Sequence, residues 1–159
     1  MPATARSLLV AVLLSSTALV TTASAQNHLR GFALELHTGY GGGGRHPDGL
    51  LGGGLIYHLD SRVDAAGFMT AVAARPDGRA VFAGLGLRVG LGGAIHPYVE
   101  AGPLLSIRSY AAGRLGTFGK VGVDAALEPR SGPWRVFLEG RAMEAGGRWA
   151  QVVAGIRYH

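Results

Sequence analysis

The stretch Val81-Phe82-Ala83-Gly84-Leu85-Gly86-Leu87-Arg88-Val89-Gly90-Leu91 decides the fold of this chain. Apolar side chains stand at every odd-numbered position, and Phe82, glycines and Arg88 stand between them. Because successive side chains of a β-strand point to opposite faces, one face is continuously apolar and the other is mostly small or ionic. A small soluble barrel packed with apolar side chains has the reverse arrangement. The stretch therefore favours a barrel that turns apolar side chains to lipid and keeps its charges inside.

The same alternation recurs along the chain, in runs close to the ~9–11 residues that a tilted transmembrane strand needs. Links rich in glycine, proline and aspartate separate the runs, so successive strands are expected to be antiparallel neighbours. The sequence thus predicts an all-β fold, an eight-stranded antiparallel up-and-down transmembrane β-barrel with no exposed edge, preceded by a signal peptide. The expected strands are 31–40, 50–59, 63–74, 80–91, 97–108, 115–127, 134–144 and 149–158. Residues 63–69 do not hold a single parity, and a β-bulge there would restore the alternation.

The first segment has the layout of a secretory signal peptide. Arg6 is the only charge before the apolar run 8–20, and Ala23-Ser24-Ala25 offers a small-x-small cleavage site. The run is too short for a transmembrane helix, which needs about 20 apolar residues, and this argues against a retained anchor. We expect residues 1–25 to be removed and residues 26–159 to form one domain, an outer-membrane β-barrel exported to the cell outer membrane.

Composition excludes some classes of site and partner. The chain has no cysteine, so it has neither a disulfide framework nor a thiolate metal site. Its net charge is +5, but the arginines are scattered singly and the chain is expected to be exported, so nucleic acid is not an expected partner. The 27 glycines would let strands curve tightly and leave space inside the barrel for long charged side chains.

Aromatic residues gather at one expected rim of the barrel. If the N-terminal end of the domain is periplasmic, the residues at this level are Phe32, Tyr57, Trp134 and Tyr158. Aromatic rings are stable at the headgroup boundary, so these four predict a periplasmic aromatic girdle in contact with outer-membrane lipid. The alternative is that aromatic residues, which are common in all strands, fall there by chance.

Charged residues alternate with the outward apolar residues, so their side chains point to the inside of the barrel. We expect them to fill the lumen as a structural ion-pair network. With a turn centred on Ala94, antiparallel partners have numbers that add up to 188, which sets Arg88 opposite Glu100. A turn centred near Ala112 would set Asp124 at the height of Glu100, so that Arg88 bridges two carboxylates. The expected network is Glu35, Arg88, Glu100, Lys120, Asp124, Glu139, Arg141 and Arg157.

The same charges have other possible interpretations. Carboxylates and a histidine in a cavity are also the groups of an acid/base site or of a polar pore. His37 and His58 are expected to approach each other across the first hairpin, but a metal ion would need more ligands than this pair. We therefore expect no catalytic residue, no cofactor and no metal. A soluble barrel of lipocalin type would need apolar residues on the lumen parity, which the alternation argues against.

Two segments resemble parts of the small outer-membrane barrels of Gram-negative bacteria, the OmpA/OmpX type and the outer membrane protein beta-barrel domain group. Residues 97–103, Pro-Tyr-Val-Glu-Ala-Gly-Pro, look like the strand opening common in that group, and residues 152–159 are similar to its closing strand. The resemblance implies the barrel-assembly machinery as a partner during biogenesis. It departs from the group at the last residue, which is usually aromatic and here is His159, and in its short loops.

The resemblance and the residues together suggest a non-enzymatic outer-membrane barrel with a structural or interaction role and an unassigned ligand. One alternative is an enzyme resembling the lipid A deacylases, which place a histidine, a serine and a carboxylate on the outer face of a small barrel. The nucleophile must lie within hydrogen-bond reach of its base, and this chain has no His-x-Ser spacing. The other alternative is a narrow pore, which needs a continuous water path between the lumen ions.

Overall fold

The computed structural model describes residues 31–43, 48–73, 80–91, 95–108, 111–127 and 132–159. The expected signal peptide, residues 1–25, lies outside these ranges. The elements are β1 (Phe32–Gly42), β2 (Asp48–His58), β3 (Val63–Val72), β4 (Ala80–Gly90), β5 (Ile95–Arg108), β6 (Ala111–Ala126), β7 (Trp134–Glu144) and β8 (Arg148–Tyr158). Each strand pairs antiparallel with the next, and β8 pairs with β1, so the eight strands close into a barrel as predicted. The described residues contain no helix long and apolar enough to cross a membrane.

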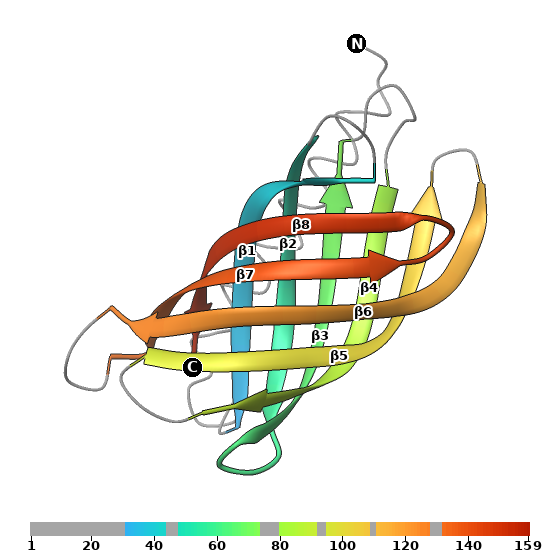
Figure 1. Cartoon of the computed structure of the whole chain (residues 1–159). Helices are drawn as coiled ribbons and strands as arrows, with labels where there is room; N and C mark the ends of the chain where they lie inside the picture. The colour runs from blue at the N-terminus through green and yellow to red at the C-terminus, as the bar shows by residue number, and fades with distance from the viewer. Residues whose placement is uncertain (1–30, 44–47, 74–79, 92–94, 109–110, 128–131) are drawn as a thin grey trace. The chain divides into compact units, whose positions relative to one another are not determined.

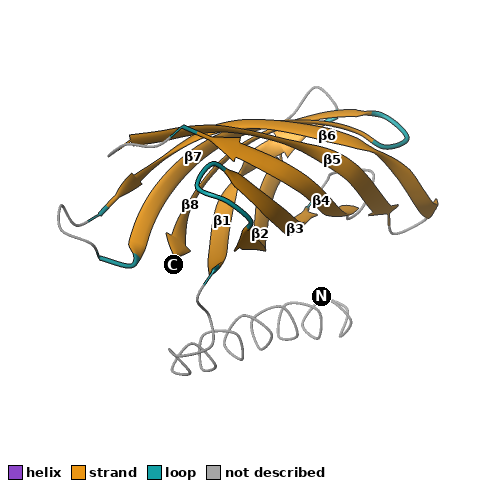
Figure 2. Cartoon of the chain, turned by 90° about the horizontal axis from the view of Figure 1, so that it is seen from below, coloured by secondary structure: helices purple, strands orange, loops and turns teal. Residues whose placement is uncertain are grey.

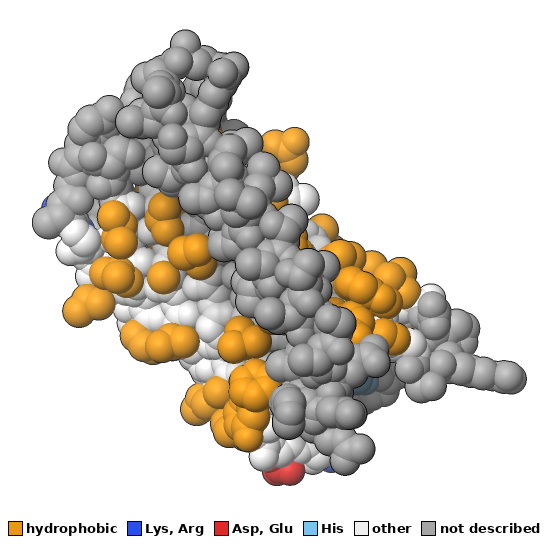
Figure 3. All heavy atoms as spheres, turned by 180° about the vertical axis from the view of Figure 1, so that it is seen from behind, with side chains coloured by type: hydrophobic (Ala, Val, Ile, Leu, Met, Phe, Trp, Pro, Cys, Tyr) orange, Lys and Arg blue, Asp and Glu red, His pale blue; other side chains and the backbone are white. Residues whose placement is uncertain are grey.

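The two faces of each strand differ as the alternation in β4 predicts. Leu85 and Leu87 point outward and are 69% and 59% exposed, whereas Phe82 and Arg88 point inward and are buried. Figure 3 shows one side of the molecule, where hydrophobic side chains lie over the described strands and charged atoms are visible only near the edge. Figure 1 shows β6, β7 and β8 crossing in front of β1 to β4 at a steep angle, and Figure 2 shows the curved sheet from below. The barrel therefore presents an apolar exterior and a separate interior surface.

The expected bulge in the third strand is wrong. In β3, residues 64–72 pair one for one with β2 and residues 63–72 pair one for one with β4. Ala66, Phe68, Thr70 and Val72 all point inward. The parity seemed broken because several of the inward residues of β3 are themselves apolar. The register shift that the structure does contain lies between Ser106 and Arg108 of β5, where β5 pairs with β6.

The interior has an apolar zone that the alternation did not predict. A buried cluster fills the lumen at the end of the barrel away from Tyr158. Apolar side chains therefore do face the lumen, contrary to what the alternation predicts, so the alternation does not by itself exclude a soluble barrel. What distinguishes this chain from such a barrel is its exposed apolar exterior. The cluster consists of Leu50, Phe68, Val72, Ala80, Phe82, Leu104, Phe118, Phe137, Met143, Ala145 and Val153.

Glycine is required where β4 and β5 approach closely. A Cβ atom at Gly102 would lie 2.0 Å from the carbonyl oxygen of Leu85 and 2.7 Å from the Cα atom of Gly86. Both atoms belong to the backbone of the neighbouring strand, so neither moves aside by a change of rotamer. Gly119 on β6 faces outward, and a Cβ atom there would meet nothing within 4 Å. The two glycines thus form a matched pair for substitution.

We expect Gly102→Ala to lower the free energy of unfolding by about 1–3 kcal/mol, the usual effect of inserting an atom into a packed site. Gly119→Ala should leave it nearly unchanged. Urea titration of the barrel refolded in detergent, followed by tryptophan fluorescence, measures both. Equal midpoints for the two variants would contradict the close approach of β4 and β5.

Candidate functional site

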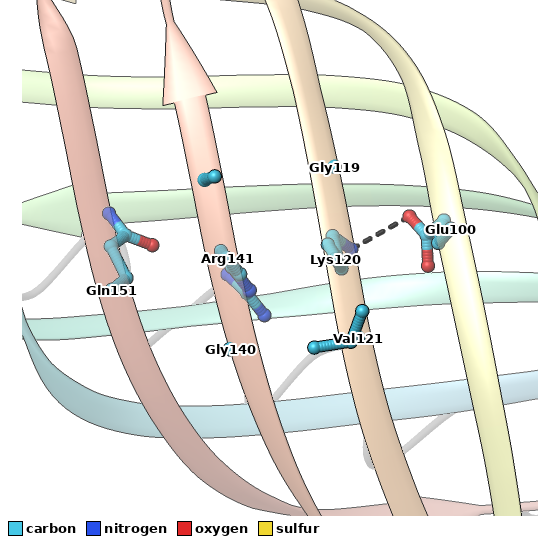
Figure 4. Close-up of a pocket in the computed structure, with 8 residues that line it drawn as sticks. Glu100, Gly119, Lys120, Val121, Gly140, Arg141 and Gln151 are labelled. Carbon is cyan, nitrogen blue, oxygen red and sulfur yellow. Dashed lines mark ion pairs between the residues drawn. The ribbon is translucent and has the colours of Figure 1, made fainter.

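A continuous row of inward-facing polar residues winds around the barrel wall, which we call the polar ladder. Each member lies directly opposite the next across a strand pair. Figure 4 shows the part of the row on β5 to β8. Strands in a barrel are staggered, so such a row rises around the barrel as it passes from strand to strand. The members are His58, Asp64, Arg88, Glu100, Lys120, Arg141 and Gln151.

Arg88 lies at the centre of the buried charges. Its Nε and Nη2 atoms donate to Glu100 Oε2 at 3.0 and 2.8 Å, and its Nη1 atom donates to Glu35 Oε1 at 3.1 Å. The guanidinium carbon also lies 4.3 Å from the centre of the Tyr98 ring, in cation–π geometry. Arg88 is 2% exposed. The predicted opposition of Arg88 and Glu100 is confirmed, and Arg88 does bridge two carboxylates, but the second is Glu35.

The expected pairing of Glu100 with Asp124 is wrong. Glu100 lies opposite Lys120, whose Nζ atom is 2.7 Å from Glu100 Oε1, and Asp124 lies opposite His96. Residues 111–114 continue β6 instead of forming the expected turn, so the centre of the hairpin moves toward residue 110 and each partner shifts. A cation therefore stands where a second carboxylate was expected. This arrangement removes the repulsion that two opposed carboxylates would have produced.

Asp124 joins the network through arginines. Arg157 Nη1 and Arg135 Nε donate to its two oxygens, and Arg157 Nε donates to Glu35 Oε1 at 2.9 Å. Arg157 thus connects Asp124 to the carboxylate that Arg88 holds. Sequence reasoning missed Arg135, although its position on the same parity as Glu139 was the signal that would have found it.

A third group of contacts surrounds Arg141. Its Nε atom donates to Glu139, and its Nη1 atom lies 2.9 Å from Thr70 Oγ1 and 3.1 Å from His37 Nε2. Tyr98 donates its hydroxyl to Glu139 Oε2 at 2.9 Å. Tyr98 and Thr70 were also missed, because neither is charged. Both occupy inward positions of their strands, so the alternation of side chains could have placed them in the lumen.

The structure brings all eight predicted lumen residues into one connected set of ion pairs. With Arg135 the set holds five cations against four carboxylates. Lys120 also lies over the rings of Phe68 and Phe118, 3.9 and 5.2 Å from their centres. The charged set therefore contacts the apolar cluster directly, and together they occupy the interior.

A depression lies beside the ladder, where β6 and β7 run next to each other. It is lined by Gly119, Val121, Gly140 and Ala142 together with four ladder residues, which Figure 4 draws as sticks. Gln151 belongs to this lining, and its buried amide oxygen and nitrogen have no hydrogen-bond partner among the described residues. The polar half of the lining consists of buried ladder residues, and the other half is apolar or glycine.

Two places in the described residues bring a histidine near a hydroxyl residue. Thr70 and His37 are in contact, at 2.9 Å, but both are buried among lumen side chains. Ser61 follows His58 by three residues, yet the two ring nitrogens of His58 contact Asp64 and His159. The expected approach of His37 to His58 is wrong, because His37 lies opposite Gly52. In the described ranges no three His, Asp or Glu side chains converge as metal ligands.

The four predicted girdle residues lie at one end of the barrel as two ring pairs. Phe32 contacts Tyr57 with ring centres 4.7 Å apart, and Trp134 contacts Tyr158 at 4.9 Å. Tyr158 also lies opposite Leu34 of β1, which places the two ring pairs on neighbouring strands. The structure thus brings the four together. Their contact with lipid stays a prediction.

Comparison with known proteins shows the fold. No protein-family model and no curated protein sequence matches the chain. Neisserial surface protein A is a solved structure similar to this one, with a TM-score of 0.65, 13% identity, and 80% of this chain and 94% of that chain covered. A de novo designed transmembrane β-barrel gives 0.59 at 15% identity over 80% and 93%. The outer membrane protein OprG of Pseudomonas aeruginosa gives 0.55 at 16% identity over 84% and 97%. The chain thus has the fold of the small eight-stranded outer-membrane β-barrels.

Proposed function

We propose that this protein is a non-enzymatic β-barrel of the outer membrane with a structural or interaction role, whose lumen is closed by the ion-pair network and the apolar cluster. The observation that carries the proposal is the combination of an apolar exterior with a filled interior. Large apolar side chains are exposed on every strand, as Met69 on β3 and as leucines, valines or isoleucines on the other seven. They would be unfavourable in water, and lipid removes that penalty. A filled interior leaves no continuous water path, which a pore needs.

Export and membrane placement belong to the same proposal. Residues 1–25 act as a cleaved signal peptide, the barrel-assembly machinery inserts residues 26–159, and outer-membrane lipid surrounds the barrel. Phe32, Tyr57, Trp134 and Tyr158 form the girdle at the periplasmic rim. The support is their common level and their pairwise ring contacts, because amphipathic rings are favoured at the headgroup boundary.

Cell fractionation tests the location. After expression in a Gram-negative host, the mature protein should be recovered in the outer membrane. It should also move at a different apparent mass on gels when the sample is heated, because the closed sheet resists detergent until it is unfolded. A periplasmic protein whose mobility does not change on heating would contradict the proposal.

Conductance in planar bilayers tests the closed lumen. The wild-type barrel should insert without producing steady single-channel currents, since side chains fill its interior. Currents that rise with salt concentration would instead favour the narrow pore, with the ion pairs as its gate. The enzyme alternative predicts release of fatty acid from lipid A by the purified barrel, and we expect none.

A further inference from the structure

Histidines meet at the rim of the barrel, outside the lumen network. His58, the last residue of β2, has its Nε2 atom 3.3 Å from Nδ1 of His159, which follows β8. The rings are almost parallel, with an interplanar angle of 7°. The two residues are 101 positions apart in sequence and come from strands separated by β1. Only closure of the barrel brings them together.

The spacing of the two nitrogens fits a metal ion. Zinc binds imidazole nitrogen at ~2.0–2.1 Å in tetrahedral geometry, which places two nitrogen ligands roughly 3.3–3.4 Å apart. The observed 3.3 Å matches that separation. Imidazole nitrogen is a preferred ligand of Zn²⁺, Ni²⁺ and Cu²⁺, whereas Mg²⁺ and Ca²⁺ prefer oxygen.

Asp64 prepares His58 to act as a ligand. Its Oδ1 atom lies 2.7 Å from His58 Nδ1, so this nitrogen carries the proton and Nε2 presents its lone pair toward His159 Nδ1, where a metal ion could take the place of the hydrogen bond. A carboxylate in this position fixes both the tautomer and the orientation of a metal-binding histidine. The backbone is also fixed, because His58 N–H donates to the Gly31 carbonyl at 2.7 Å and His159 N–H donates to the Pro133 carbonyl at 2.9 Å.

We infer that His58 and His159 form a two-histidine site for a divalent ion of the Zn²⁺, Ni²⁺ or Cu²⁺ class, with Asp64 as the positioning residue and water at the open rim supplying the further ligands that a histidine pair lacks. His58 is partly exposed, which gives an ion and its water ligands access.

The surrounding charges allow a cation to bind. Arg157 and Arg135 lie near His159, but both are paired with Asp124, and Arg157 is also paired with Glu35. Asp64 adds a negative charge on the other side of the site. A bound ion would tie the residue after β8 to the β2–β3 hairpin, across β1. Because the unfolded chain does not hold these residues together, the ion would stabilise the folded barrel by mass action.

Zinc titration of the refolded, untagged barrel by calorimetry tests the inference. We expect saturable binding of one ion, and an affinity at least about tenfold lower for either His58→Gln or His159→Gln. Asp64→Asn should weaken binding by about 10–100-fold, the usual effect of losing a carboxylate that orients a ligand. His96→Gln is the matched control, because His96 lies near Asp124 at 3.7 Å and is not part of this pair. It should bind like the wild type.

Electron paramagnetic resonance of bound Cu²⁺ counts the nitrogen ligands. The wild type should show coupling to two imidazole nitrogens, and His159→Gln to one. The urea midpoint without metal verifies that each variant is folded. Binding that persists unchanged in the double variant His58→Gln, His159→Gln would place the ion on other histidines and overturn the inference. Absence of saturable binding at millimolar Zn²⁺ would overturn it as well.

Discussion

Arg88→Ala should lower the free energy of unfolding by about 3–5 kcal/mol, because the buried carboxylates that share Arg88 would lose its charge-assisted hydrogen bonds with no water to replace them. Arg88 donates to Glu100 and Glu35, and its Nη2 atom lies 4.0 Å from Glu139. Alanine would leave each of these carboxylates with a single cation, which is Arg157 for Glu35 and Arg141 for Glu139. The neighbouring Lys120 already pairs with Glu100, so it compensates only part of the loss.

Urea unfolding in detergent, monitored by the heat-dependent gel shift, measures the effect of Arg88→Ala. Arg148→Ala is the control, since Arg148 is exposed at the start of β8 and should change stability little. The double variant Arg88→Met, Glu100→Gln removes the charge of both partners and should recover part of the loss. If Arg88→Ala is as stable as the wild type, the lumen is hydrated and the ion pairs do not hold the barrel closed.

Phe82→Ala should also lower the free energy of unfolding by about 3–5 kcal/mol, through lost burial and the cavity left behind. Phe82 is fully buried in the apolar cluster, and its ring contacts the ring of Trp149 with centres 4.9 Å apart. The lumen is closed on all sides by strands, which limits collapse of the site around the missing ring. The emission of Trp149 should therefore change together with the stability.

Leu85→Ala is the matched control for Phe82→Ala on the same strand. Leu85 points to the outside and is 69% exposed, so its truncation leaves no internal cavity. We expect a much smaller loss of stability for Leu85→Ala in detergent titrations. An equal loss for the two variants would show that the interior of β4 is not packed as described.

The alternation in β4 shows which features of the barrel the sequence predicts. A period of two residues is a local property of strands, so the sides of Leu85 and Arg88 follow once the strand is recognised. The opposition of Arg88 and Glu100 also follows, because a short link fixes the register of a hairpin. Tyr98, Thr70 and Arg135 also occupy inward positions of their strands. The alternation therefore predicts that they face the lumen as well, although two are uncharged and one lies at a strand end.

The ion-pair partners of Glu100 and Glu35 could not be predicted from the alternation. The link between β5 and β6 is shorter than its composition suggested, and the change of register replaced Asp124 by Lys120 opposite Glu100. Glu35 reaches Arg88 across the lumen from a strand that does not neighbour β4. Such a contact depends on the diameter and stagger of the closed barrel, which no single hairpin contains.

The sequence by itself determined the eight strands, their antiparallel order, the apolar exterior and the identity of the charged lumen residues, because these depend on a local period of two and on short links. Only the tertiary structure decided which charges pair across the lumen, where the apolar cluster fills it, and that His58 meets His159. These are contacts between distant strands, and they exist because β8 closes on β1 with one particular stagger.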